Sequence, residues 1–133
     1  MDSVQLTGNA RHGLSHEPFF DFERLKVYQA ALSFLDEILD VADKLPRHLQ
    51  SSLGDQLRRA ALSISNNLAE GSGKRSPREK ARYYATASDS THECLSMLNV
   101  LQRRKLVKDN QFCSLRQQGR EITSMIHGLL NSL

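Results

Sequence analysis

Two helical segments joined by a short glycine-containing break constrain most strongly how this chain can fold. In residues 55–70 apolar side chains recur at helical spacing, at Leu57, Ala60, Ala61, Ile64 and Leu68. Gly71 predicts the end of this helix, because glycine accepts the left-handed conformation of a C-terminal cap. The next helix is predicted to start with Ser76 as cap, Pro77 at its first position and Glu79 completing a capping box. The segment therefore predicts a helix, a tight loop and a second helix.

Basic side chains surround this loop, at Lys74, Arg75, Arg78, Lys80 and Arg82. A helix N-terminus carries unpaired N–H groups and a partial positive charge, so an anionic partner such as a phosphate backbone would offset the repulsion among these cations. The alternative is a solvated basic turn whose charges are screened by salt. The loop is not a P-loop, because Leu68 occupies the position of the first glycine and Arg75 replaces the Ser or Thr.

The remaining periodicity predicts helices at about residues 22–45, 52–70, 77–105 and 110–130, with Asp21, Ser52 and Asp109 in capping positions at the first, second and fourth. In the first helix the stripe expected to face inward is Leu25, Tyr28, Leu32, Leu35, Leu39 and Ala42. The second helix is apolar over a wide arc, which indicates a central place in its bundle or a second side buried by another subunit. We expect an all-α fold, an up-down-up-down four-helix bundle over residues 21–133.

Composition limits the setting of this bundle. The chain has 133 residues, a formal net charge of +3 and a pI of about 9.1, which suits one domain and permits a nucleic-acid partner without requiring it. Residues 1–20 show no periodicity and predict a flexible N-terminal tail, or an arm that docks through Phe19 and Phe20. Without a long apolar run or a signal-peptide pattern, we expect a cytoplasmic protein with no membrane contact.

Other candidate residues have structural explanations beside functional ones. Arg58 and Arg59 follow Asp55 by three and four positions, so they form ion pairs within the helix or contact nucleic acid. Asn67 and Glu70 lie on or near the apolar arc, where a structural polar network would fix the register of the helices. The basic residues that end the third helix face its negative end, which favours a structural role for Arg103, Arg104, Lys105 and Lys108.

No catalytic or metal site is predicted. A di-iron bundle needs two Glu-x-x-His pairs and two further carboxylates, and only Asp89-x-x-His92 comes near that pattern. Cys94 and Cys113 have neither CxxC spacing nor an identifiable base partner, so a zinc site, a disulfide framework and a thiol nucleophile are not indicated. We expect a protein that is not an enzyme and has no cofactor.

Several stretches, taken together, resemble one family, the bacterial four-helix-bundle proteins encoded in 23S rRNA intervening sequences. The resemblance covers about residues 20–130 and is carried by FERLKVYQAA at 22–31, DQLRRAALSI at 55–64, NLAEG at 67–71, GKRS at 73–76, and Tyr83-Tyr84, Ala87, Ser88, Ser90 and Glu93. It implies an up-down bundle assembled into a ring-like homo-pentamer, with no known enzyme activity. Lys74-Arg75 matches a basic pair that is frequent in the family.

The resemblance also implies partners. It points to RNA or a ribosomal component, and a related branch comprises accessory proteins of diversity-generating retroelements, which bind nucleic acid and a reverse transcriptase. We therefore expect a homo-oligomeric nucleic-acid-binding bundle, with RNA favoured over DNA. The residues expected to contact phosphates are Arg58, Arg59, Lys74, Arg75, Arg78, Lys80 and Arg82. The alternative is a protein-interaction scaffold, or a reverse-transcriptase accessory protein of a diversity-generating retroelement.

Overall fold

The computed structural model describes residues 20–133, which form four α-helices and no strand. These are α1 (Lys26–Asp43), α2 (Asp55–Ser72), α3 (Pro77–Arg103) and α4 (Asp109–Asn131). A 3-10 turn, η1 (Asp21–Arg24), precedes α1, while a 3-10 turn, η2 (Arg47–Leu49), and a π-helical turn, η3 (Gln50–Gly54), lead into α2. The expected all-α class is confirmed for this part of the chain. Except for Phe20, the predicted tail lies outside the described residues, as does Phe19.

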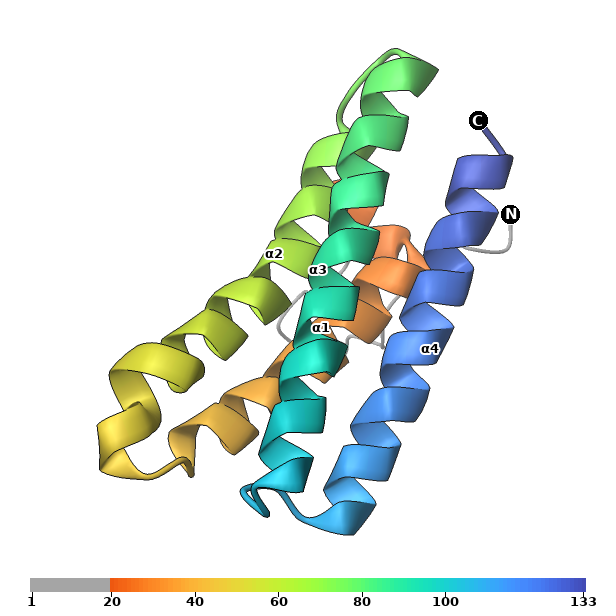
Figure 1. Ribbon diagram of the computed structural model, residues 1–133. Helices are drawn as coiled ribbons and strands as arrows, with labels where there is room; N and C mark the ends of the chain where they lie inside the picture. Colours follow the sequence, from red (N-terminus) through yellow and green to blue (C-terminus); the bar gives the residue numbers. More distant parts are fainter. Residues whose placement is uncertain (1–19) are drawn as a thin grey trace, which may run out of the picture.

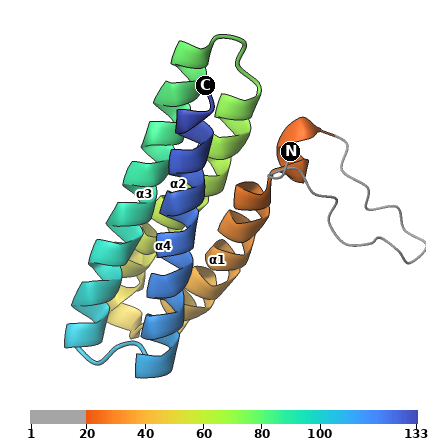
Figure 2. The same ribbon diagram turned by 90° about the vertical axis from the view of Figure 1, so that its right-hand side faces the viewer.

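The four helices form a bundle in which each helix contacts two others. α1 packs on α2 and α4, and α3 packs on α2 and α4, with the most extensive contact between α2 and α3. Figure 1 shows the α2–α3 connection alone at one end of the molecule, with the α1–α2 and α3–α4 connections at the other. In Figure 2, α1 lies beside α4 and the η1 turn projects from the side of the bundle. The basic loop therefore lies at a projecting end.

The predicted arc of α2 is the centre of the core. All five of its apolar residues are buried, and the neighbouring helices of the same chain cover them. The buried core of the described residues comprises Val27, Ala31, Phe34, Ile38, Val41, Ala42, Leu45, Leu57, Ala60, Ala61, Ile64, Leu68, Tyr84, Ala87, Cys94, Leu98, Leu101, Leu115, Ile122 and Ile126. Packing against α1 and α3 accounts for the wide apolar arc within one chain, as expected for a central place in the bundle. Burial of this helix by another subunit stays a prediction.

The predicted inward face of α1 is wrong by one residue. Its buried residues are Val27, Ala31, Phe34, Ile38, Val41 and Ala42, whereas the predicted stripe, Ala42 excepted, is only partly buried. Both sets recur at helical spacing and lie about 100° apart on the helix, so periodicity cannot choose between them. Packing against α2 and α4 selects the set that contains Phe34. The other set leaves Leu32, Leu35 and Leu39 partly accessible on the outer side.

Three predicted N-terminal caps are wrong, and the fourth is right. Leu25, Gly54 and Lys108 occupy the cap positions of α1, α2 and α4, and none supplies a side-chain cap. Short 3-10 and π-helical turns lead into α1 and α2 and displace their starts from Asp21 and Ser52, while Asp109 is already inside α4. Ser76 caps α3 as predicted, because its Oγ accepts the Glu79 N–H at 3.0 Å.

Gly71 has a different role from the predicted left-handed cap. α2 continues through it to Ser72, and the cap residue Gly73 has an ordinary right-handed φ of −82°. A Cβ at Gly71 would lie 2.8 Å from Cε1 of Tyr84 and 2.9 Å from Cβ of Tyr83. The glycine is needed because α3 passes too close for any side chain.

Gly71→Ala should lower the free energy of unfolding by about 1–2 kcal/mol, since overpacking outweighs the gain in helix propensity. Gly128→Ala is the matched control, because a Cβ there meets nothing within 4 Å. That change should raise the free energy by up to about 1 kcal/mol. Urea denaturation of both variants gives the comparison, and a Gly71→Ala protein as stable as the parent would contradict the close approach.

Candidate nucleic-acid interface

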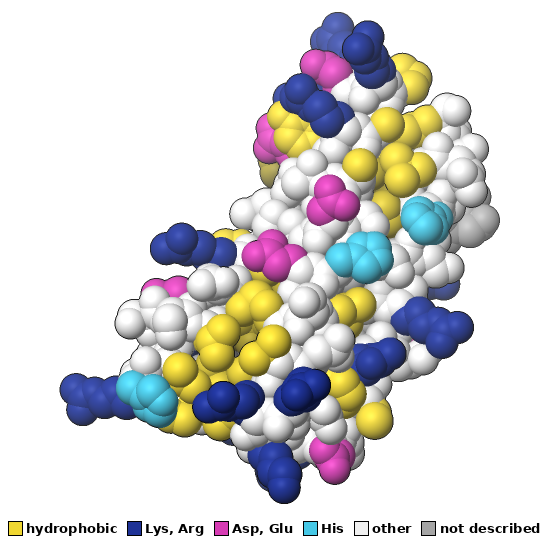
Figure 3. All heavy atoms as spheres, in the orientation of Figure 1, with side chains coloured by type: hydrophobic (Ala, Val, Ile, Leu, Met, Phe, Trp, Pro, Cys, Tyr) yellow, Lys and Arg dark blue, Asp and Glu magenta, His cyan; other side chains and the backbone are white. Residues whose placement is uncertain are grey.

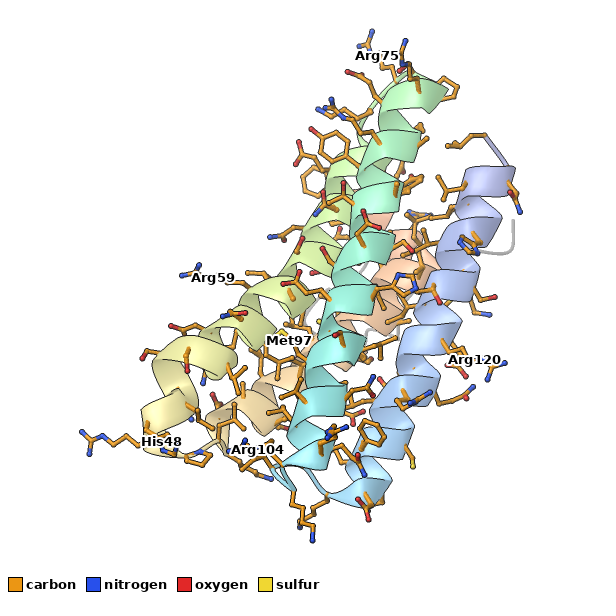
Figure 4. All side chains as sticks on the ribbon, in the orientation of Figure 1. His48, Arg59, Arg75, Met97, Arg104 and Arg120 are labelled. Atoms are coloured by element: carbon orange, nitrogen blue, oxygen red, sulfur yellow. The ribbon has the colours of Figure 1, made fainter. Side chains whose placement is uncertain are left out.

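The candidate interface is the α2–α3 tip, residues 71–83, where α2 ends and α3 begins. The cap by Ser76 and the placement of Pro77 at the first helical position fix the start of α3. Arg75 stands at the extreme end of the molecule in Figure 4. The sharp reversal therefore presents a run of basic side chains at a projecting point.

Two of these side chains are exposed and unpaired. Arg75 and Arg78 are exposed, and within residues 20–133 neither takes part in an ion pair or side-chain hydrogen bond. Their neighbour Lys74 is partly buried, with its Nζ 3.7 Å from a carboxylate oxygen of Glu70. This is a weak surface pair of the kind that contributes about 0–1 kcal/mol.

A half-buried aromatic ring organises the cations next to it. Lys74 Nζ lies 5.2 Å from the centre of the Tyr83 ring, and the Arg82 guanidinium carbon lies 5.4 Å from it. A ring face attracts cations, so Tyr83 holds two positive groups close together despite their repulsion. Its neighbour Tyr84 points into the core, and burial raises the pKa of its phenol.

Lys80 has a structural role at the end of α2. Its Nζ donates to the carbonyl oxygen of Ser72 at 3.0 Å and reaches that of Gly71 at 3.5 Å. These carbonyls belong to the last turn of α2, which has no following helical N–H groups to accept from. Lys80 therefore closes the C-terminus of α2, and its charge is partly engaged at the negative end of that helix.

Arg58 is part of the junction between α1 and α2 rather than of the tip. Its guanidinium donates to Asp43 Oδ1 and to Asp55 Oδ1, each at 3.0 Å. It also donates to the side-chain oxygen of Gln50, whose Nε2 donates in turn to the Leu45 carbonyl at 2.8 Å and the Ala42 carbonyl at 3.0 Å. The predicted intrahelical pair with Asp55 is present. Arg58 has no unengaged face like that of Arg75, so the structure favours its structural role.

Arg59 is exposed but far from the other predicted contacts. It points away from the bundle in Figure 4, and no ion pair to it exists among residues 20–133. Lys74 follows it by fifteen positions, and at 1.5 Å per helical residue the separation is on the order of 20 Å. The structure therefore brings together the five bases of residues 74–82 and leaves Arg58 and Arg59 apart.

A small polar chain links α2 to α3 inside the bundle. Asn67 Nδ2 donates to the Ser63 carbonyl at 2.8 Å and to Ser63 Oγ at 2.9 Å, and Ser63 Oγ shares a 2.8 Å hydrogen bond with Ser90 Oγ. Asn67 thus lies in a network between helices, as a register-fixing role requires. Glu70 is exposed and pairs with Lys74 instead, so it lies outside this network.

The sequence analysis identified neither Gln50 nor the hollow at the opposite end of the bundle. Lys44, at the end of α1, lines one hollow with Lys105 and Lys108 of the α3–α4 connection. The available signal was that basic residues follow the ends of both α1 and α3, which two neighbouring connections bring together. Within the described residues, no three His, Cys, Asp or Glu side chains are placed to hold a metal ion, and no helix is long and apolar enough to cross a membrane.

Comparison with known proteins gives a family and a fold. The model of the family described as 23S rRNA-intervening sequence protein matches residues 23–128. No curated protein matches the sequence. Among solved structures, a protein of unknown function from the S23 ribosomal protein family of Bacteroides thetaiotaomicron is similar, with a TM-score of 0.73. The two sequences are 20% identical, and the match covers 78% of this chain and 97% of the other. At that identity the likeness shows a shared fold.

Arg58→Ala should lower the free energy of unfolding by about 1–2 kcal/mol, because it removes several charge-assisted hydrogen bonds of a partly screened guanidinium. Arg59→Ala is the matched control and should change it by less than about 0.5 kcal/mol. Urea denaturation measures both. Equal effects for the two variants would contradict the structural role of Arg58.

The cysteines should differ in reactivity. Burial, with a smaller contribution from Glu93, raises the pKa of the Cys94 thiol to about 12, while Cys113 is exposed. Only the thiolate reacts, so at pH 8 alkylation should modify Cys113, and Cys94 should react about a thousandfold more slowly until the protein unfolds. Mass spectrometry after iodoacetamide treatment, with and without denaturant, measures this. Rapid double modification of the native protein would contradict the buried placement of Cys94.

Proposed function

The chain belongs to the 23S rRNA-intervening sequence protein family, and from this premise we propose that it is a non-enzymatic, cytoplasmic RNA-binding protein that uses the α2–α3 tip. The observation that carries the proposal is the pair of exposed, unpaired guanidinium groups, Arg75 and Arg78, beside the cations that Tyr83 holds. Guanidinium groups bind phosphate oxygens with paired N–H donors, and displaced counterions add a favourable term.

Recognition in this proposal is of backbone and shape. Aromatic residues make up 6% of the chain, and at the tip Tyr83 is already covered by Lys74 and Arg82. Sequence-specific RNA recognition depends on base stacking and base-edge contacts, for which the tip offers few groups. Phosphate contacts position a protein on nucleic acid without reading its sequence. RNA is favoured over DNA because the family description names an rRNA element.

We further propose that the chain is an up-down-up-down bundle that assembles into a ring-like homo-oligomer, a pentamer by family resemblance. Apolar groups are available for contacts between subunits: Val100 of α3 is 45% exposed and Leu62 of α2 is 47% exposed. Partly buried Met97 lies three positions before Val100, and hydrophobic side chains form a patch on the lower half of the face in Figure 3. Repetition around a ring would convert a weak contact of each chain into strong overall binding.

The triple variant Lys74→Glu, Arg75→Glu, Arg78→Glu should weaken binding to a structured RNA at least tenfold, while the fold and the oligomer mass stay unchanged. Because each lost phosphate contact retains counterions, the salt dependence should also become shallower, by about two units of slope. Fluorescence anisotropy at several salt concentrations measures affinity and slope together, and light scattering measures the mass against the 15.0 kDa chain.

The control reverses three charges on another face. Lys26, Arg116 and Arg120 are exposed on α1 and α4, and their change to Glu alters net charge equally. This control should keep most of the affinity. Equal loss in both variants would indicate a general charge effect and contradict the tip as a site. An oligomer that ignores RNA and DNA at all salt concentrations would instead favour a protein scaffold, such as an accessory protein for a reverse transcriptase.

A further inference from the structure

A hollow lined by lysines lies at the opposite end of the bundle from the tip. It measures about 730 Å³ and lies open to solvent between the end of α1, the end of α3 and the connection into α4. Three lysines line it, one from the end of α1 and two from the α3–α4 connection: Lys44, Lys105 and Lys108. We call this site the lysine hollow. The same hollow has an apolar side formed by Val41, Leu106 and Val107.

Two of the three lysines occupy positions that the local structure disfavours. Lys105 has a φ of 59°, the left-handed conformation in which glycine or asparagine is usual. Lys108 is the cap residue before α4, where the positive end of the helix dipole favours an acidic or hydroxyl side chain. The negative helix ends favour a positive charge at Lys105 after α3, as at Lys44 after α1, but they do not account for the left-handed backbone of Lys105 or for a cation at the cap of α4.

The charge of the lysine hollow is not neutralised from within. None of its three lysines forms an ion pair inside residues 20–133, and Asp109 is the carboxylate in its lining. Two nearby carboxylates have other partners, since Asp43 pairs with Arg58 and Glu37 accepts from Gln118 Nε2 at 2.6 Å, while exposed Asp40 lies four positions before Lys44 on α1. The exposed Arg103 and Arg104 add charge at the end of α3, and Figure 4 shows Arg104 at this end.

We propose that the lysine hollow is a second site for RNA phosphates, so that one chain holds two separate segments of RNA backbone, one at each end. This inference rests on the proposed function, because it assumes that the tip binds RNA. The ammonium group of lysine is a compact point charge with three donors and binds phosphate oxygens, and RNA is the partner already proposed for the tip. Among the described residues, the cations that line the hollow are all lysines.

The two sites are separated by distance and by charge. The 27 residues of α3 span the distance between them, which at 1.5 Å per residue is about 40 Å. Acidic side chains lie between the ends, including the exposed Asp89 and Glu93 of α3, and Figure 3 shows acidic groups on the face between the basic upper and lower ends. A strand running along the molecule would meet these carboxylates. Two distinct segments, one at each end, avoid them.

Stoichiometry with a short RNA tests the proposal. A hairpin whose stem has about six base pairs extends no more than about 20 Å, so it cannot reach both ends of one chain. We expect titration of the full chain at low salt to reach two hairpins per chain. The tip variant defined above should bind one, the variant Lys44→Glu, Lys105→Glu, Lys108→Glu should bind one, and their combination none. The variant of Lys26, Arg116 and Arg120 should keep two.

A single substitution separates binding from folding. Lys105→Gly removes one charge from the lysine hollow and also relieves the left-handed backbone, so its thermal midpoint should rise while binding of the second hairpin weakens about threefold. This single substitution therefore tests the site even if the triple variant of the lysine hollow is unstable or does not fold. Weaker binding in a more stable protein cannot come from loss of structure.

Different results overturn different claims. If the tip variant loses one hairpin but reversal of the three lysines changes nothing, the lysine hollow is not an RNA site and the proposed function stands. If the full chain binds no hairpin, the proposed function itself fails. If polyglutamate competes with the hairpin for the lysine hollow at equal charge concentration, the site is for acidic protein segments and the RNA assignment is wrong.

Discussion

The close approach of α2 and α3 is the constraint on which the rest of the structure depends. Small residues of α2 make this approach possible: Gly71 lies against Tyr83 and Tyr84, and Ser63 shares a hydrogen bond with Ser90. Small side chains allow helix axes to come close, and the two hydroxyls form a direct hydrogen bond. The loop between the two helices is short, because α2 ends at Ser72 and α3 begins at Pro77. That shortness projects Arg75 and Arg78 into solvent at one end.

The opposite end depends on electrostatic contacts rather than on small residues. The amide of Gln50 donates to the last carbonyls of α1, and the guanidinium of Arg58 joins Gln50 to Asp43 and Asp55. Such contacts satisfy carbonyl groups that every helix C-terminus leaves without a partner. The same end of α1 also lies next to the α3–α4 connection, where Lys44 lines a hollow with Lys105 and Lys108.

Periodicity and capping chemistry in the sequence predicted the helices, and the α2–α3 hairpin most accurately. Ser76 and Pro77 fit only the start of a helix, and in the structure they are the cap and the first residue of α3. The inward face of α1 could not be predicted, because two apolar stripes fit one helix and only packing distinguishes them. Gly71 has two physical uses, conformational freedom and absence of a side chain, and the second is visible only when Tyr84 is placed beside it.

For the candidate site, the sequence predicted where basic residues gather but not which of them are already engaged. Arg58 and Lys80 satisfy carbonyl and carboxylate groups of the fold, and a cation bound in this way would have to break those contacts to meet a phosphate. Within residues 20–133, Arg75 and Arg78 have no such contacts to lose. A phosphate is therefore attracted by the full charge of Arg75 and Arg78. Its attraction to Arg58 and Lys80 is reduced by the contacts that these side chains already make. The strength of a basic surface depends on its unengaged charges, and the short reversal between α2 and α3 brings two of them, Arg75 and Arg78, together at one projecting end.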